Sequence, residues 1–148
     1  MKSLILLGLA VLAGAVLPVQ AGLNAKVGKA VGDPVYAALI SFVIGSIGLF
    51  LYVLASKTAF NQISETYTLN WSVWTAGLLG AFYVAAVVIL VPKIGTALTF
   101  GLVVAGQLGL SLFIDHYGLL GIPAHQINWQ RIVGIIAIIA GVLLIRNF

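Results

Sequence analysis

Five long apolar stretches constrain this chain more than any other feature of its sequence. They lie at residues 3–27, 34–55, 71–91, 94–117 and 129–146, and the whole sequence is 62% hydrophobic and only 7% charged. Soluble proteins average roughly 45–50% apolar and about 25% charged residues. A helix needs about 20 largely apolar residues to cross the hydrocarbon core of a bilayer. The sequence therefore predicts an all-α membrane protein with five transmembrane helices, forming one domain over residues 1–148.

Helix-boundary signals lie between these stretches. Asp33 followed by Pro34 predicts an N-cap with proline at the first helical position. Asn128 predicts a second cap, at the start of the last helix. Pro92 predicts that the third helix ends near residue 91, because the residue before a proline disfavours the helical conformation. Lys93 would then form a very tight turn into the fourth helix.

A polar segment interrupts the first apolar stretch. Residues 4–17 carry no polar side chain, and Pro18, Gln20 and Asn24 then follow within seven positions. Gln20 and Asn24 share one helix face, and Pro18 tends to kink the helix because it leaves the carbonyl of Gly14 without its usual partner. Polar groups at membrane depth are costly and tend to mark function. We therefore expect this segment to form one side of a polar site.

The same N-terminal segment imitates a secretory signal. A lysine and an apolar run precede the small-x-small sequence at residues 19–21, which is typical of a cleavage site. Cleavage there would leave four spans. The shared polar face and the helical pattern beyond residue 21 favour a first helix that is retained.

Three polar residues recur every four positions in the fourth apolar stretch: Gln107, Ser111 and Asp115. Gln107, near the middle of the helix, is expected either to line a substrate cavity or to make an interhelical hydrogen bond. Asp115 is expected to titrate, to bind a cation, to pair with a lysine, or only to reach the lipid head groups. Tyr83, in the third stretch, either lines the same cavity or packs against other helices.

Gly134 and Gly141 are seven residues apart in the otherwise bulky last stretch. Small residues on one face allow membrane helices to approach closely. They predict either a dimer interface or packing within the chain.

Neither catalysis nor a bound cofactor is indicated. The chain has no cysteine, which excludes disulfides and thiolate metal sites. His116 and His125 have no spacing partner that would complete a metal site, and no nucleophile–base pair, P-loop or dinucleotide-binding loop is present. The net charge of +4 forms no basic face with interleaved aromatics, so nucleic acid is not an expected partner.

The lysines and arginines do not orient the chain. In a chain with five spans, three basic residues lie on the side of the N-terminus: Lys2, Lys57 and Arg131. The other four lie on the opposite side: Lys26, Lys29, Lys93 and Arg146. The positive-inside rule needs a clear excess on one side. Either the chain inserts in both orientations, or another feature sets a single one.

Several segments resemble one family of small membrane proteins. They are residues 18–24, 41–45, 106–108, 115–119, 131–134 and 140–144, and they resemble the YdcZ-like family of five-helix bacterial inner-membrane proteins in the drug/metabolite transporter superfamily. The resemblance implies half of a ten-helix fold whose two halves are inverted, and an antiparallel homodimer would recreate that arrangement. The related small multidrug resistance proteins carry a glutamate in their first helix. This chain has no acid in that helix.

Together these features predict a dimeric small-molecule transporter, an exporter that works by alternating access. Its cavity would be lined by Gln20, Asn24, Tyr83, Gln107, Ser111 and Asp115. In an antiparallel dimer, Gln20 and Asn24 of one chain would lie level with Asp115 of the other. The expected partners are the lipid bilayer, an unidentified small molecule and a second copy. The alternatives are a membrane subunit that does not transport and a small channel.

Overall fold

A computed structural model describes residues 2–56 and 69–147 of the chain. Within those ranges the secondary structure is helical, with short turns between helices. The chain divides into two compact units, Met1–Lys93 and Ile94–Phe148, and each is described by itself. That the whole chain forms one transmembrane domain remains a prediction.

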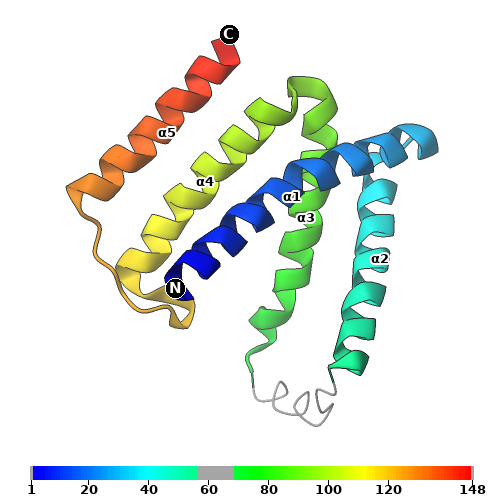
Figure 1. Ribbon diagram of the computed structural model, residues 1–148, viewed down its shortest axis with the longest axis horizontal. Helices are drawn as coiled ribbons and strands as arrows, with labels where there is room; N and C mark the ends of the chain where they lie inside the picture. The colour runs from blue at the N-terminus through cyan, green and yellow to red at the C-terminus, as the bar shows by residue number, and fades with distance from the viewer. Residues whose placement is uncertain (1, 57–68, 148) are drawn as a thin grey trace. The chain divides into compact units, whose positions relative to one another are not determined.

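The first unit contains three long helices (Figure 1). Helix α1 spans Lys2–Val31 and continues through Pro18, and α2 spans Pro34–Ala55. A short 3-10 helix, η2 (Trp71–Thr75), leads into α3 (Ala76–Ile94). Asp33 accepts hydrogen bonds at Oδ1 from the amides of Val35 and Tyr36, at 2.6 and 3.4 Å, so the predicted N-cap of α2 is confirmed.

Small side chains bring α1 and α2 into close contact. Ala21, Gly28, Ala37 and Ala38 are all buried where the two helices meet. A Cβ atom added at Gly28 would lie 3.3 Å from Pro34 Cα and 3.6 Å from Ala37 Cβ. Because a methyl group would already be tight, glycine at residue 28 allows the end of α1 to lie against the start of α2.

Helix α3 ends later than Pro92 predicts. It continues through Pro92 to Ile94, and the chain turns at Gly95, which has a φ of +83°. The expected end near residue 91 and the turn at Lys93 are therefore wrong. A proline fixes its own φ near the helical value and removes only one amide donor, so the helix is able to pass through Pro92 to Ile94. The positive φ at residue 95 then favours glycine, which has no Cβ atom.

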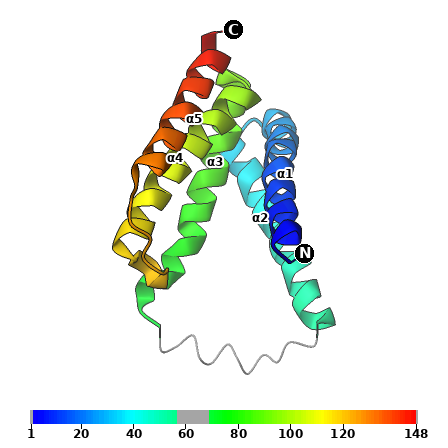
Figure 2. The ribbon, with the colours of Figure 1, turned by 60° about the vertical axis from the view of Figure 1, so that its left-hand side comes forward.

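The second unit is a pair of helices joined by a loop (Figure 2). Helix α4 spans Thr96–Tyr117, a 3-10 turn η3 covers Leu119–Gly121, and α5 spans Trp129–Asn147. The fourth helix thus begins two residues later than the expected residue 94. Asn128 Oδ1 accepts a hydrogen bond from the amide of Arg131 at 2.9 Å, which confirms the predicted cap of α5.

Helices α4 and α5 lie close together at Gly101. A Cβ atom at this position would lie 2.8 Å from Val142 Cγ2, and Val142 is buried. Two residues earlier, Thr99 is also buried, and its hydroxyl donates to the carbonyl oxygen of Gly95 at 2.6 Å. The absence of a side chain at residue 101 therefore allows α5 to approach α4.

Five segments of the described chain are long and apolar enough to cross a membrane: Leu4–Val31, Pro34–Ala55, Trp71–Ile94, Thr96–Tyr117 and Trp129–Asn147. Large apolar side chains on these helices are widely exposed, including Leu9, Ile44 and Phe82. Such a surface is compatible with lipid and not with water. The predicted all-α membrane protein with five spanning helices is confirmed.

Candidate functional site

Gln20 contacts α2 through a polar side chain. Its Nε2 atom donates to the hydroxyl oxygen of Ser41 at 3.5 Å, a long hydrogen bond between two half-buried residues. The small residues beside them keep the two helices close enough for this contact. In the sequence, Ser41 is indistinguishable from the other small residues of its helix, because only the pairing of α1 with α2 reveals its partner.

Asn24 lies one helical turn further along α1 and is more deeply buried. Only 8% of its surface is exposed, and its Nδ2 atom has no hydrogen-bond partner among the residues that the structure describes. A buried donor without a partner costs about 1–3 kcal/mol, so such groups are rare and often mark a functional position. The side of α1 that Gln20 and Asn24 share thus carries one satisfied and one unsatisfied amide.

Tyr83 is half-buried midway along α3. Its hydroxyl makes no hydrogen bond with Gln20 or Asn24, although all three belong to the first unit. Its expected place beside these two residues in a cavity stays a prediction.

In the second unit, Asp115 forms an ion pair with Arg131. Asp115 Oδ2 lies 2.5 Å from Arg131 Nη2, and both side chains are partly buried. Arg131 Nη1 also donates to the carbonyl oxygen of His125 at 3.2 Å. From the sequence, pairing with a lysine was one of four alternatives for Asp115, and Arg131 was not among its expected partners. The guanidinium group instead bridges the end of α4 and the loop before α5.

Two more hydrogen bonds attach this loop to α4. The amide of His125 donates to the backbone carbonyl of Asp115 at 2.7 Å, and the amide of Ile127 donates to His116 Nδ1 at 3.2 Å. His116, in the last turn of α4, therefore accepts a hydrogen bond from the loop, a role that its spacing in the sequence did not indicate. Within residues 2–56 and 69–147, no group of three or more His, Asp or Glu side chains is placed to hold a metal ion.

A cavity of about 340 Å³ lies between α4 and α5 beside the ion pair. Its polar lining comes from Ser111, Asp115 and Arg131, and Gly134 lies in the same lining. Gln107 does not line it. The side chain of Gln107 is exposed on α4 and makes no hydrogen bond within the described residues. Residues four apart are rotated by about 40° around a helix with 3.6 residues per turn, so Gln107 and Asp115 diverge over two steps.

The structure therefore forms two separate polar groups. One joins Gln20 to Ser41 beside Asn24, and the other joins Ser111 and Asp115 to Arg131. They belong to different units, and each is described only within its own. Gly141 is half-buried on α5, and no atom lies within 4 Å of the Cβ position at either Gly134 or Gly141.

Five spanning helices with polar groups inside them define a multi-pass membrane protein. Residues 5–144 match the model of a family described as "Putative inner membrane exporter, YdcZ", and the chain therefore belongs to the YdcZ family. It is 27% identical over 148 residues to "Inner membrane protein YdcZ" of Escherichia coli (strain K12), an alignment that covers 99% of this chain and 98% of that protein. No solved structure matches the chain significantly. The family and the five spans indicate a multi-pass protein of the inner membrane.

Proposed function

We propose that this protein exports small molecules from the cell as a homodimer that alternates access to a cavity at the bilayer midplane. The description of its family, "Putative inner membrane exporter", supports this proposal, because exporters are a class of transporter. The observation that carries the proposal is the unpartnered Nδ2 atom of Asn24, buried inside a spanning helix. A solute with a carbonyl or carboxylate oxygen would satisfy this donor.

The polar groups on other helices support the same function. Gln20 lies one turn from Asn24 with a long hydrogen bond to Ser41, which a solute is able to replace. Gln107 presents an exposed amide near the middle of a spanning helix, where lipid offers it no partner. In the proposed cavity these amides bind the solute together with Tyr83, Ser111 and Asp115.

The dimer is proposed to be antiparallel. Inverted copies of one fold supply the symmetry that alternating access uses in many transporters. The near equality of positive charges on the two sides of the membrane supports insertion in both orientations. Nothing lies within 4 Å of the Cβ position of Gly141, which supports a place for the second copy along α5, whereas Gly134 also lines the cavity between α4 and α5.

Asn24→Leu tests the function, because it separates a binding role from a packing role. Cells that express the protein are compared with cells carrying an empty vector across a panel of growth inhibitors, to find compounds to which it confers resistance. Asn24→Leu should abolish that resistance. It should also raise the free energy of unfolding in detergent by about 1–3 kcal/mol, because it removes an unsatisfied buried donor. A structural asparagine would instead lose stability on this change.

Gln107→Leu is the second variant, and it should keep the fold and the dimer while removing resistance. Gln126→Leu, at an exposed loop position, is the matched control and should keep resistance. Full resistance in both Asn24→Leu and Gln107→Leu would contradict the cavity. A panel in which expression changes no compound's effect would favour a membrane subunit that does not transport.

A further inference from the structure

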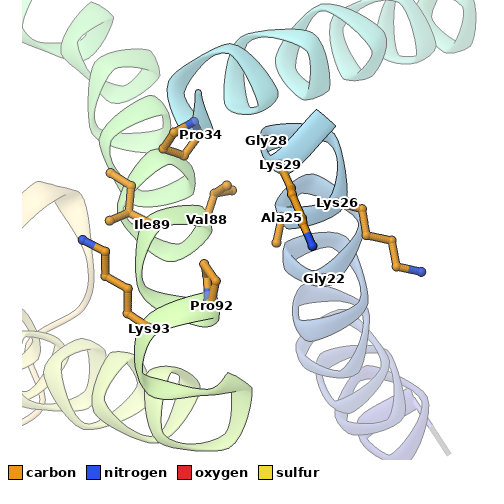
Figure 3. A pocket seen from close by; sticks show the side chains of 10 residues that line it. All are labelled: Gly22, Ala25, Lys26, Gly28, Lys29, Pro34, Val88, Ile89, Pro92 and Lys93. Atoms are coloured by element: carbon orange, nitrogen blue, oxygen red, sulfur yellow. The ribbon is translucent and has the colours of Figure 1, made fainter. Parts of the chain in front are cut away.

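A cavity lies inside the first unit, between α1, the start of α2 and the end of α3 (Figure 3). Its volume is about 670 Å³, within the range of about 300–1,000 Å³ that is typical of small-molecule sites. Val88, Ile89 and Pro92 of α3 form one side, and Gly22 and Ala25 of α1 face them. Its interior is therefore apolar, and an alkyl chain would fit there without desolvating polar groups.

Three lysines, Lys26, Lys29 and Lys93, belong to the lining of this apolar space. Lys29 lies in the last turn of α1 and Lys93 in the last turn of α3, so both are at ends of spanning helices. Figure 3 shows the Lys29 side chain running along α1, while Lys26 points away from α3 and Lys93 points away from α1. The ends of spanning helices lie at the level of the lipid head groups, and the long alkyl stems of lysine let the ammonium groups turn toward a ligand there.

No carboxylate in the described ranges neutralises these lysines. Asp33, beside the cavity, accepts the amide hydrogens of α2 and forms no ion pair. Asp115 is paired with Arg131 in the other unit. The cavity thus combines an apolar interior with unpaired positive charge at its edge, and this combination fits a molecule with an acidic head and an apolar tail.

We propose that this cavity binds an anionic phospholipid of the surrounding bilayer. The phosphate lies among Lys26, Lys29 and Lys93, and an acyl chain lies along Val88 and Ile89. Basic pockets between membrane helices bind acidic lipid head groups in this way. A small soluble anion such as inorganic phosphate would leave the apolar interior uncovered. The site is independent of the exported solute, so it stands or falls separately from the proposed function.

Native mass spectrometry of the full chain tests the site. The protein is purified in detergent and titrated with palmitoyl-oleoyl phosphatidylglycerol or with palmitoyl-oleoyl phosphatidylcholine, which has the same chains and no net charge. We expect tighter retention of phosphatidylglycerol. Lys29→Gln should weaken it about fivefold, the effect of roughly one lysine near an anionic lipid. The triple variant at residues 26, 29 and 93 should weaken it further, while the three corresponding Lys→Arg changes should preserve it.

Two matched controls separate the site from general charge and from misfolding. Arg146→Gln removes one positive charge from the last turn of α5 and should leave binding unchanged. Gly22→Leu fills the cavity without changing charge, since nothing lies within 4 Å of its Cβ position, and should reduce binding. Gly45→Leu, in equally open space away from the cavity, should not. Equal retention of both lipids, equal effects of Lys29→Gln and Arg146→Gln, or full competition by inorganic phosphate would overturn the proposal.

Discussion

Arg131 connects the end of α4 to the loop before α5, through its side chain and its backbone amide. Its guanidinium group pairs with Asp115 and donates to His125, and its backbone amide is capped by Asn128. An arginine is suited to this position because its planar group donates in several fixed directions at once. The geometry of the loop between α4 and α5 therefore depends on this residue.

Removal of either partner of the ion pair should cost stability, and the two losses should not add. Asp115→Ala and Arg131→Ala each leave a partly buried charge without its partner. Because both side chains are also partly exposed, we expect a coupling energy of only about 1 kcal/mol. A double-mutant cycle on unfolding in detergent micelles measures it. Arg146→Ala, which removes an arginine with no ion pair in the described chain, is the control. Strictly additive losses would show that the pair contributes nothing.

At the scale of the helices, the distance between α4 and α5 depends on Gly101. Gly101→Ala would place a methyl group 2.8 Å from Val142 Cγ2. Valine has one strongly preferred χ1 rotamer in a helix, so the clash is relieved mainly by moving the helices apart. We expect a loss of about 1–3 kcal/mol, typical of overpacking, measured as a lower free energy of unfolding in detergent.

Two variants identify the cause of that loss. Gly106→Ala, on the same helix with nothing within 4 Å of its Cβ position, should leave stability unchanged or raise it. Val142→Ala added to Gly101→Ala should restore much of the lost stability, because it removes the methyl groups in conflict. Equal losses from Gly101→Ala and Gly106→Ala would mean that the interface is not closely packed at this position.

At the scale of the whole molecule, the proposed antiparallel dimer is testable by cross-linking. The chain has no cysteine of its own. Asn24 is buried, so its exposed neighbour Leu23 is the better position for one cysteine. Tyr117, two residues after Asp115 in the sequence, is the position for the other. These side chains are 56% and 61% exposed. Chains carrying Leu23→Cys should cross-link in the membrane to chains carrying Tyr117→Cys.

If the dimer is antiparallel, the two chains insert in opposite orientations, and a C-terminal reporter should be active on both sides of the membrane. Gly141→Leu should reduce cross-linking, because a bulky side chain blocks close approach of the second copy. Gly45→Leu, a glycine in equally open space on α2, is its control. Cross-links only between identical positions, with the reporter active on one side alone, would contradict the antiparallel arrangement and indicate a parallel one.

The spanning helices were predictable from the sequence by itself. Hydropathy over about 20 residues is a local property, and so are the caps at Asp33 and Asn128, whose side chains bond to amides only two or three residues away. The end of α3 was misplaced for a related reason. A proline keeps a helical φ and removes only one amide donor, so α3 continues through Pro92, and the position of the next turn depended on Gly95.

Partners across helices were decided only by the tertiary structure. The spacing of Asp115 predicted an ionisable group near a helix end, but its pairing with Arg131 required the loop to fold α5 back against α4. The spacing of Gln20 and Asn24 predicted a shared face. The Gln20 amide has a hydrogen-bond partner and the Asn24 amide nitrogen has none, and this difference depends on the residues that α2 places opposite them. Periodicity along one helix indicates which side chains share a face. The packing of a second helix determines what that face meets.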